Sequence, residues 1–304
     1  MFCSICFKKS GYTVLTNDSL YSDFVISKAI IENKNVILNE NFLNFKLTEE
    51  EIKKKYNEIS FLTDKLYFKN EVEELAEFLI MAEKIGSTSN EYKKYLLLSL
   101  IRRAMIRKLP YSRMNIPWEQ IVKLRDEEYS YKKYKRKRAY YNFTFKKHIT
   151  DNIQNYNNAV FDNGKNNKAY HKDAFDLICN LNENVDIIYI DPPYPSTMNK
   201  YGDFYGLFDK ITHNEINYTN LTQKDTFLEN FLNIINLCKN KTKYIVISEN
   251  NKTNPSATDL VNVLKGFGTV KIISKEHQYK LTGKTNKNST NEMLIILKIG
   301  KSSL

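Results

Sequence analysis

The stretch VDIIYIDPPY, residues 185–194, is the most informative part of the sequence for the fold. Residues 185–190 include three isoleucines and a valine, which predicts a short buried strand. Pro192 and Pro193 then fix φ and remove backbone N–H donors, so the strand must end in a rigid turn. In an open α/β sheet, ligands bind beyond the carboxyl ends of the strands. The turn at 191–194 is therefore the first candidate for a functional site.

Strands and helices alternate on both sides of this stretch. The apolar patterns predict strands at 12–16, 168–171, 185–190, 244–248, 269–274 and 293–298, and helices at 2–9, 19–33, 175–181, 227–239 and 258–265. Residues 152–168 are polar and rich in asparagine, which predicts a loop. This alternation predicts an α/β fold with a Rossmann-like, doubly wound sheet.

The segment from 46 to 150 differs in character, because its periodic apolar residues predict helices alone. Thr48 and Glu51 form a capping-box pattern before a helix to about residue 59, and further helices are expected at 71–85 and 91–108, where Pro110 stops the last one. We therefore predict three parts: residues 1–45 as the first part of one α/β domain, 46–150 as a helical insertion, and 151–304 as the rest of that domain.

The residue types at 191–194 suit the activation of an exocyclic amine. The lone pair of such an amine is delocalised into the base, so the group is a poor nucleophile. The Asp191 carboxylate can accept one N–H and the Pro192 carbonyl the other, which favours pyramidal geometry and frees the lone pair. Pro193 keeps the turn rigid, and Tyr194 offers a ring on which a base rotated out of the duplex can stack. The alternative is a plain strand-terminating turn.

With these surroundings, the motif Asp191-Pro192-Pro193-Tyr194 resembles that of the DNA amino-methyltransferases. The order of parts is similar to the alpha arrangement of Dam-like and FokI-type methylases, with the target-recognition region inserted between the cofactor half and the catalytic half. The resemblance implies transfer of a methyl group from S-adenosylmethionine to the N6 amine of adenine in a specific sequence of double-stranded DNA. It also implies pairing of function with a cognate restriction endonuclease.

The resemblance also implies residues that hold the cofactor. An acidic residue after the second strand of the family binds the ribose hydroxyls, which corresponds to Asp18 with Asn17 beside it. Asp173 and Ala174 correspond to the family's contact with the cofactor adenine, and Asp191 closes the site. For Asp18 and Asp173 the alternative role is that of a helix cap. Tyr201 lies in the loop expected to contact the flipped base, and packing within that loop is its alternative.

The charge predicts a polyanionic partner. The formal net charge is +11 with a pI near 9.2, although an AT-rich genome also favours lysine and asparagine. Residues 129–141 interleave cations with tyrosines and contain no acid, so we expect them to bind phosphates and bases. The candidate DNA-binding residues are Arg102, Arg103, Arg113, Lys132, Lys133, Lys135, Arg136, Lys137, Arg138 and Tyr201.

One departure from the family concerns its first strand and the Gly-rich turn that follows it. No such turn precedes the strand at 12–16, and Gly266-Phe267-Gly268 comes before a strand rather than after one. Three explanations stay open: a truncated reading frame, which we favour, a split enzyme completed by a second chain, or a fragment of a longer protein.

Other classes of protein receive little support. Cys3 and Cys6 lack a second close cysteine pair, so we expect no metal site and no disulfide. No signal peptide or membrane span is apparent, so a cytoplasmic protein without a membrane partner is expected. The alternatives to adenine methylation are cytosine-N4 methylation, a DNA-binding or split-enzyme fragment without activity, and methylation of RNA or a protein amide. The acidic first residue of the motif favours adenine.

Overall fold

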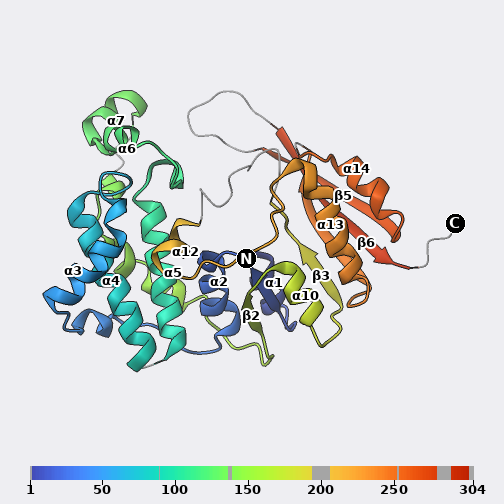
Figure 1. The fold of residues 1–304 in the computed structure, drawn as a ribbon, viewed down its shortest axis with the longest axis horizontal. Helices are drawn as coiled ribbons and strands as arrows, with labels where there is room; N and C mark the ends of the chain where they lie inside the picture. The colour runs from blue at the N-terminus through green and yellow to red at the C-terminus, as the bar shows by residue number, and fades with distance from the viewer. Residues whose placement is uncertain are drawn as a thin grey trace. The chain divides into compact units, whose positions relative to one another are not determined.

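The fold was analysed in a computed structural model, which describes residues 2–88, 90–135, 139–193, 206–251, 253–278 and 289–300 (Figure 1). The chain divides into two compact units. Residues 1–171 with 202–216 form the first unit, and residues 172–201 with 217–304 form the second. Each unit has its own hydrophobic core.

The first unit begins with helix α1 (Phe2–Lys9), which ends before Gly11, where a positive φ of 83° suits glycine. Strand β1 (Leu15–Asp18) pairs in parallel with β2 (Lys168–His171). Strand β1 is followed by α2 (Tyr21–Ser27) and the π-helical turn η1 (Lys28–Glu32). The predicted strand at 12–16 is wrong in its bounds, because the ladder with β2 continues through Asn17 and Asp18.

The rest of the first unit is helical, as expected for residues 46–150. Thr48 and Glu51 form the capping box at the start of α3, which confirms that prediction. The elements are η2 (Glu40–Asn44), α3 (Glu49–Ile59), η3 (Ser60–Leu62), α4 (Lys69–Thr88), α5 (Glu91–Arg107), η4 (Pro110–Ser112), α6 (Trp118–Arg125), α7 (Glu127–Tyr134), η5 (Ala139–Tyr141), α8 (Phe145–Thr150) and α9 (Ile153–Asn157). Helix α9 corrects the expected loop at 152–168.

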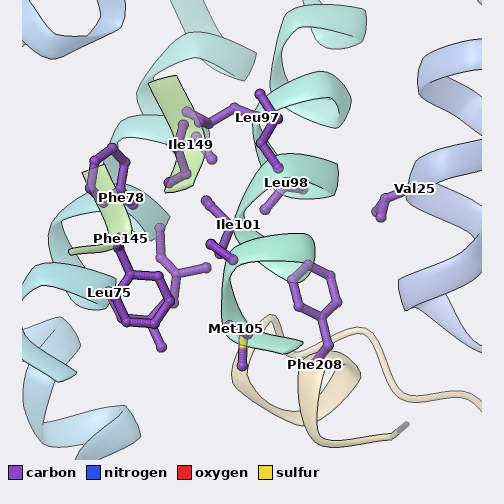
Figure 2. Packing of buried hydrophobic residues seen from close by; sticks show 14 of the residues in the cluster. Val25, Leu75, Phe78, Leu97, Leu98, Ile101, Met105, Phe145, Ile149 and Phe208 are labelled. Atoms are coloured by element: carbon purple, nitrogen blue, oxygen red, sulfur yellow. The ribbon is translucent and has the colours of Figure 1, made fainter. Parts of the chain in front are cut away.

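One apolar cluster joins these helices to the β1–β2 region. Figure 2 shows Leu75 and Phe78 of α4, Ile101 of α5 and Phe145 of α8 converging, and Phe208 enters from helix α12 (Leu207–Ile211). Burial of each large apolar side chain stabilises the fold by about 1.5–3 kcal/mol. The cluster therefore holds the segment after residue 205 against helices that precede it by a hundred residues.

The second unit is built on a four-stranded sheet in the order β3-β4-β6-β5. Its strands are β3 (Ile187–Ile190), β4 (Tyr244–Asn250), β5 (Gly268–Gln278) and β6 (Ser289–Ile299), of which β3 and β4 are parallel and β6 is antiparallel to both neighbours. Helices α10 (Ala174–Asn180), α13 (Lys224–Cys238) and α14 (Ala257–Leu264) pack on the face that carries Ile245 and Ile247.

The structure corrects the expectation that β3 is fully buried. Ile187 is 47% exposed, and the other three residues of the strand are only partly buried. Within the described residues β3 bonds β4 alone, so it is an edge strand with helices on one face. The α/β class is confirmed, with one parallel and one mixed sheet.

Candidate active site

Asp191 directly follows β3 in the second unit, at the carboxyl end of a parallel pair of strands. Ile190 is aligned with Ile247, so the next residues, Asp191 and Ser248, lie side by side and their side chains share one face of the sheet. Burial by the surrounding protein raises the pKa of Asp191, while a hydrogen bond from the Ser248 side chain opposes the rise. The Asp191 carboxyl group is thus partly enclosed at a strand end, while the residue as a whole stays exposed enough to contact a substrate.

Two further carboxyl groups lie near Asp191. Glu249 is 1% exposed, and burial raises its pKa to about 7, with smaller contributions from the charges of Asp191 and Glu292.

Pro192 is buried and Pro193 is partly buried, so the turn is packed against the protein as a rigid acceptor requires. Tyr194 and Tyr201, predicted to contact the base, lie outside the described residues.

Asp18 ends β1 in the first unit, and Asn17 precedes it on the same strand. Its Oδ1 accepts a hydrogen bond from the Leu20 N–H at 2.8 Å. Burial, together with the charges of Asp23 and Asp209, raises the pKa of Asp18 to about 7. The carboxyl group thus occupies the strand end where the sequence predicted a ribose contact.

The helix after Asp18 is capped by a different residue. Helix α2 has Leu20 at its N-cap and no capping bond from that side chain. Instead Asp209 of α12 accepts hydrogen bonds from the N–H groups of Tyr21 at 2.7 Å and Ser22 at 2.9 Å. The alternative role for Asp18, that of the helix cap, is therefore largely filled by Asp209.

Asp173 and Ala174 lie in the second unit at the start of α10. Asp173 is the N-cap, and its Oδ1 accepts from the Phe175 N–H at 2.7 Å. Its other oxygen accepts from the Thr219 N–H at 2.5 Å, and the residue is 9% exposed. The structure therefore shows the capping role for Asp173, and the cofactor contact stays a prediction.

The predicted DNA-binding arginines on α5 have protein partners. Arg102 Nη2 lies 3.2 Å from Asp23 Oδ1, and Arg103 Nε donates to Asn152 Oδ1 at 3.2 Å. Both side chains are partly buried, whereas Arg113 is exposed. These two contacts tie α5 to α2 and to the start of α9, so Arg102 and Arg103 have a structural role whether or not they contact DNA.

The basic segment, residues 129–141 after α6, is the more exposed candidate for DNA binding. Lys132 and Lys133 lie on α7, and Lys135 ends that helix in the left-handed conformation. Lys133 Nζ donates to the Tyr129 hydroxyl at 3.1 Å, so cations and tyrosines do interleave on one helix surface. Arg136, Lys137 and Arg138 lie outside the described residues. Among the described residues no group of three or more histidine, cysteine or acidic side chains is placed to hold a metal.

Two residues of the site, Ser248 and Asp209, carry no signal in the local sequence. Ser248 lies within β4 in the stretch VISEN, residues 246–250, and its place beside Asp191 appears only through the register with β3. Asp209 stands in a short helix far from Asp18 in sequence, and no local pattern shows that its partner is α2.

Comparison with known proteins identifies the chain. Residues 3–281 match the sequence model of the D12 class N6 adenine-specific DNA methyltransferases. The chain belongs to this family. The family uses S-adenosylmethionine as methyl donor, and its substrate is the N6 amine of adenine in DNA. The Dam-like resemblance inferred from Asp191–Tyr194 is confirmed.

Two curated proteins are similar over nearly the whole chain. The type II methyltransferase M2.HphI of Haemophilus parahaemolyticus is 38% identical over 305 residues, covering 97% of this chain and 87% of that protein. The modification methylase StsI of Streptococcus sanguinis is 26% identical over 321 residues, covering 95% of this chain and 44% of that protein. This D12 methyltransferase therefore spans most of the length of M2.HphI but less than half of the length of StsI. In the described residues, none of its helices is both long and apolar enough to cross a bilayer.

Proposed function

We propose that Asp191 and Pro192 form the amine-binding turn of this adenine methyltransferase, with Pro193 and Tyr194 completing it. The observation that carries the proposal is the position of Asp191 at the end of β3, beside Ser248, in a chain of this family. The Asp191 carboxylate accepts one N–H of the adenine amine and the Pro192 carbonyl accepts the other. Bound S-adenosylmethionine supplies the sulfonium methyl group.

The same groups deal with the surplus proton. When the nitrogen lone pair forms its bond to the methyl group, the C–S bond breaks and the nitrogen keeps one proton too many. Asp191 is the acceptor already bonded to that nitrogen, and its raised pKa makes it a better base than an exposed carboxylate. Ser248 donates to the carboxylate, which directs the remaining oxygen toward the amine.

Four residues are proposed to hold the methyl donor besides Asp191. Asp18 and Asn17 bind the ribose hydroxyls, and Asp173 and Ala174 border the adenine ring of the cofactor. The chemistry of the donor set supports this, because a carboxylate accepts two hydroxyl protons and Asp18 is not the main cap of α2. The proposed architecture is a Rossmann-like sheet formed by residues 1–45 and 151–304, with residues 46–150 as the helical target-recognition insertion.

The raised pKa of Asp18 makes cofactor affinity dependent on pH. The carboxylate, not the neutral acid, accepts two hydroxyl protons, and in the free protein the pKa of Asp18 is about 7. As the pH falls from 8 to 6, most of this carboxyl becomes protonated, so we expect affinity for S-adenosylmethionine to fall about tenfold. Calorimetric titration at several pH values checks this. The D18N variant should bind weakly at every pH, and an unchanged pH profile in D18N would contradict the assignment.

We propose that the basic segment binds the DNA backbone through Lys132, Lys133, Lys135 and Arg136–Arg138, together with Arg102, Arg103 and Arg113, while Tyr201 contacts the displaced base. Replacing both Lys132 and Lys133 with alanine should weaken DNA binding on all sequences, because phosphates carry no base identity. The slope of log K against log salt should become less steep by about 1.8, from about 0.9 per lost phosphate contact.

Fluorescence anisotropy at several salt concentrations measures that slope. The matched control is Lys271→Ala, which removes an exposed lysine from β5. An unchanged slope in the double variant, or an equal change in the control, would show that α7 does not bind phosphates.

The biological role that we propose is modification in a type II restriction–modification system, in the cytoplasm, with a cognate endonuclease that cleaves the same unmethylated site. The similarity to M2.HphI over 97% of the chain supports this role. Expression of the chain in a host without adenine methylation tests it. Sequencing that detects modified bases should find methyladenine at one recurring short sequence, and methylation without any common sequence would refute it.

A further inference from the structure

The start of α2 depends on a carboxylate that is distant in sequence. The first N–H groups of a helix have no partner within the helix and need capping. Leu20 cannot cap them, and Asp209 accepts from two of them, Tyr21 N–H at 2.7 Å and Ser22 N–H at 2.9 Å. Asp18 accepts from the N–H just before these, that of Leu20. Asp18 and Asp209 thus bind three successive amides at the end of β1.

Asp209 is held firmly in place. It is 3% exposed, and its neighbours Phe208 and Ile211 are 0% and 1% exposed in the core of the first unit. Phe208 stacks on Tyr21 with ring centroids 6.4 Å apart, and Figure 2 shows the Phe208 ring directed into the cluster that contains Met105. The Asp209 carboxylate therefore fixes the position and direction of the start of α2 relative to the end of β1.

This arrangement releases Asp18 from most of the capping. A carboxylate that had to cap α2 alone would direct both oxygens at amides, whereas here only one bond to an amide is formed by Asp18. We propose that Asp209 is a positioning residue for the cofactor site, which orients the Asp18 carboxylate toward the ribose hydroxyls by taking over the cap of α2. This rests on the proposed role of Asp18 in binding S-adenosylmethionine.

Several charged or titratable groups surround Asp209. They are Asp18 on β1, Tyr21 and Asp23 on α2, and Arg102 on α5, while His171 on β2 lies against Tyr21 with its ring 5.4 Å from the Tyr21 ring. Burial raises the pKa of Asp209 to about 6, although its two backbone hydrogen bonds oppose the rise. The charge of Asp209 also raises the pKa of Asp18. Removing Asp209 should therefore change both the position and the titration of Asp18.

The test uses Asp209→Asn, which preserves size but leaves one acceptor oxygen for two N–H donors. At pH 8 we expect the dissociation constant for S-adenosylmethionine to rise at least tenfold, while kcat at saturating cofactor stays within about threefold. The pH midpoint of cofactor binding should move below about 7, because Asp18 loses a negative neighbour. Asp209→Glu keeps the charge on a longer side chain, so it should weaken cofactor binding three- to tenfold without lowering the pH midpoint of binding. This second variant tests the proposal if Asp209→Asn does not fold.

The matched control is Asp23→Asn, which removes another charge near Asp18 but caps no α2 amide through its side chain. It should lower the pH midpoint and leave the affinity at pH 8 within about twofold. Unchanged affinity in both folded Asp209 variants, with weakened binding in D18N, would overturn the positioning role alone. Unchanged affinity in D18N as well would overturn the proposed ribose contact on which that role rests.

Discussion

Replacing Asp191 with alanine is expected to reduce methyl transfer to adenine by about 10³-fold, while the affinity for S-adenosylmethionine changes less than about threefold because the proposed cofactor contacts at Asp18 and Asp173 remain. The amine would lose the acceptor that frees its lone pair, and the surplus proton would lose its base. Single-turnover assays with radiolabelled cofactor measure the transfer, and calorimetry measures the affinity.

The control for this variant is Asp186→Ala. Asp186 is an exposed acid immediately before β3, so its loss changes the charge by the same amount without touching the turn. Its rate should stay within about twofold of the wild type. Turnover by the Asp191 variant at the rate of this control would mean that the amine is activated by some other group.

Replacing Glu71 with glutamine is expected to lower the free energy of unfolding by about 3–5 kcal/mol, because two buried cations would lose their anion. Glu71 of α4 lies 2.7 Å from Lys108 Nζ and receives hydrogen bonds of 2.8 and 2.5 Å from the Arg125 guanidinium. All three residues are buried. The cluster joins α4, α5 and α6, so its loss should also loosen the basic segment that follows α6.

Urea denaturation followed by circular dichroism measures the effect of this substitution. The control is Glu73→Gln on the same helix, an acid whose side chain is 45% exposed and lies 3.9 Å from Lys69, which should cost less than about 1 kcal/mol. Burial opposes ionisation of Glu71, yet the hydrogen bonds from Arg125 and the charge of Lys108 hold its pKa below the usual value. Its contribution is therefore present above pH 4.5 and lost as the pH falls through that lowered pKa. Equal stability of the two variants would contradict the account.

Local patterns in the sequence predicted much of the fold. The capping box at Thr48, the helix stop near Gly11 and the strands that flank Asp191 depend on neighbouring residues, so the sequence shows them directly. The expectation of a buried β3 failed because burial depends on what packs against each face and edge. A run of isoleucines has the same pattern in an edge strand as in a central one.

The candidate site divides in the same way. Asp191 and Asp18 were predicted because each stands at the carboxyl end of a strand, where ligands bind in α/β sheets. Ser248 and Asp209 act through partners distant in sequence, and only the strand register and the α12 contact reveal them. Asp173 shows the opposite case, because its position matches a cofactor residue while its oxygens bind the amides of Phe175 and Thr219.

We propose that this chain methylates the N6 amine of adenine in DNA through Asp191 and Pro192. The most direct measurement incubates the purified chain with S-adenosylmethionine and unmethylated DNA, digests the product to nucleosides and identifies the modified base by mass spectrometry. We predict N6-methyladenine with the wild type and none above background with D191A. N4-methylcytosine as the sole product, or N6-methyladenine at equal yield from both proteins, would contradict the account.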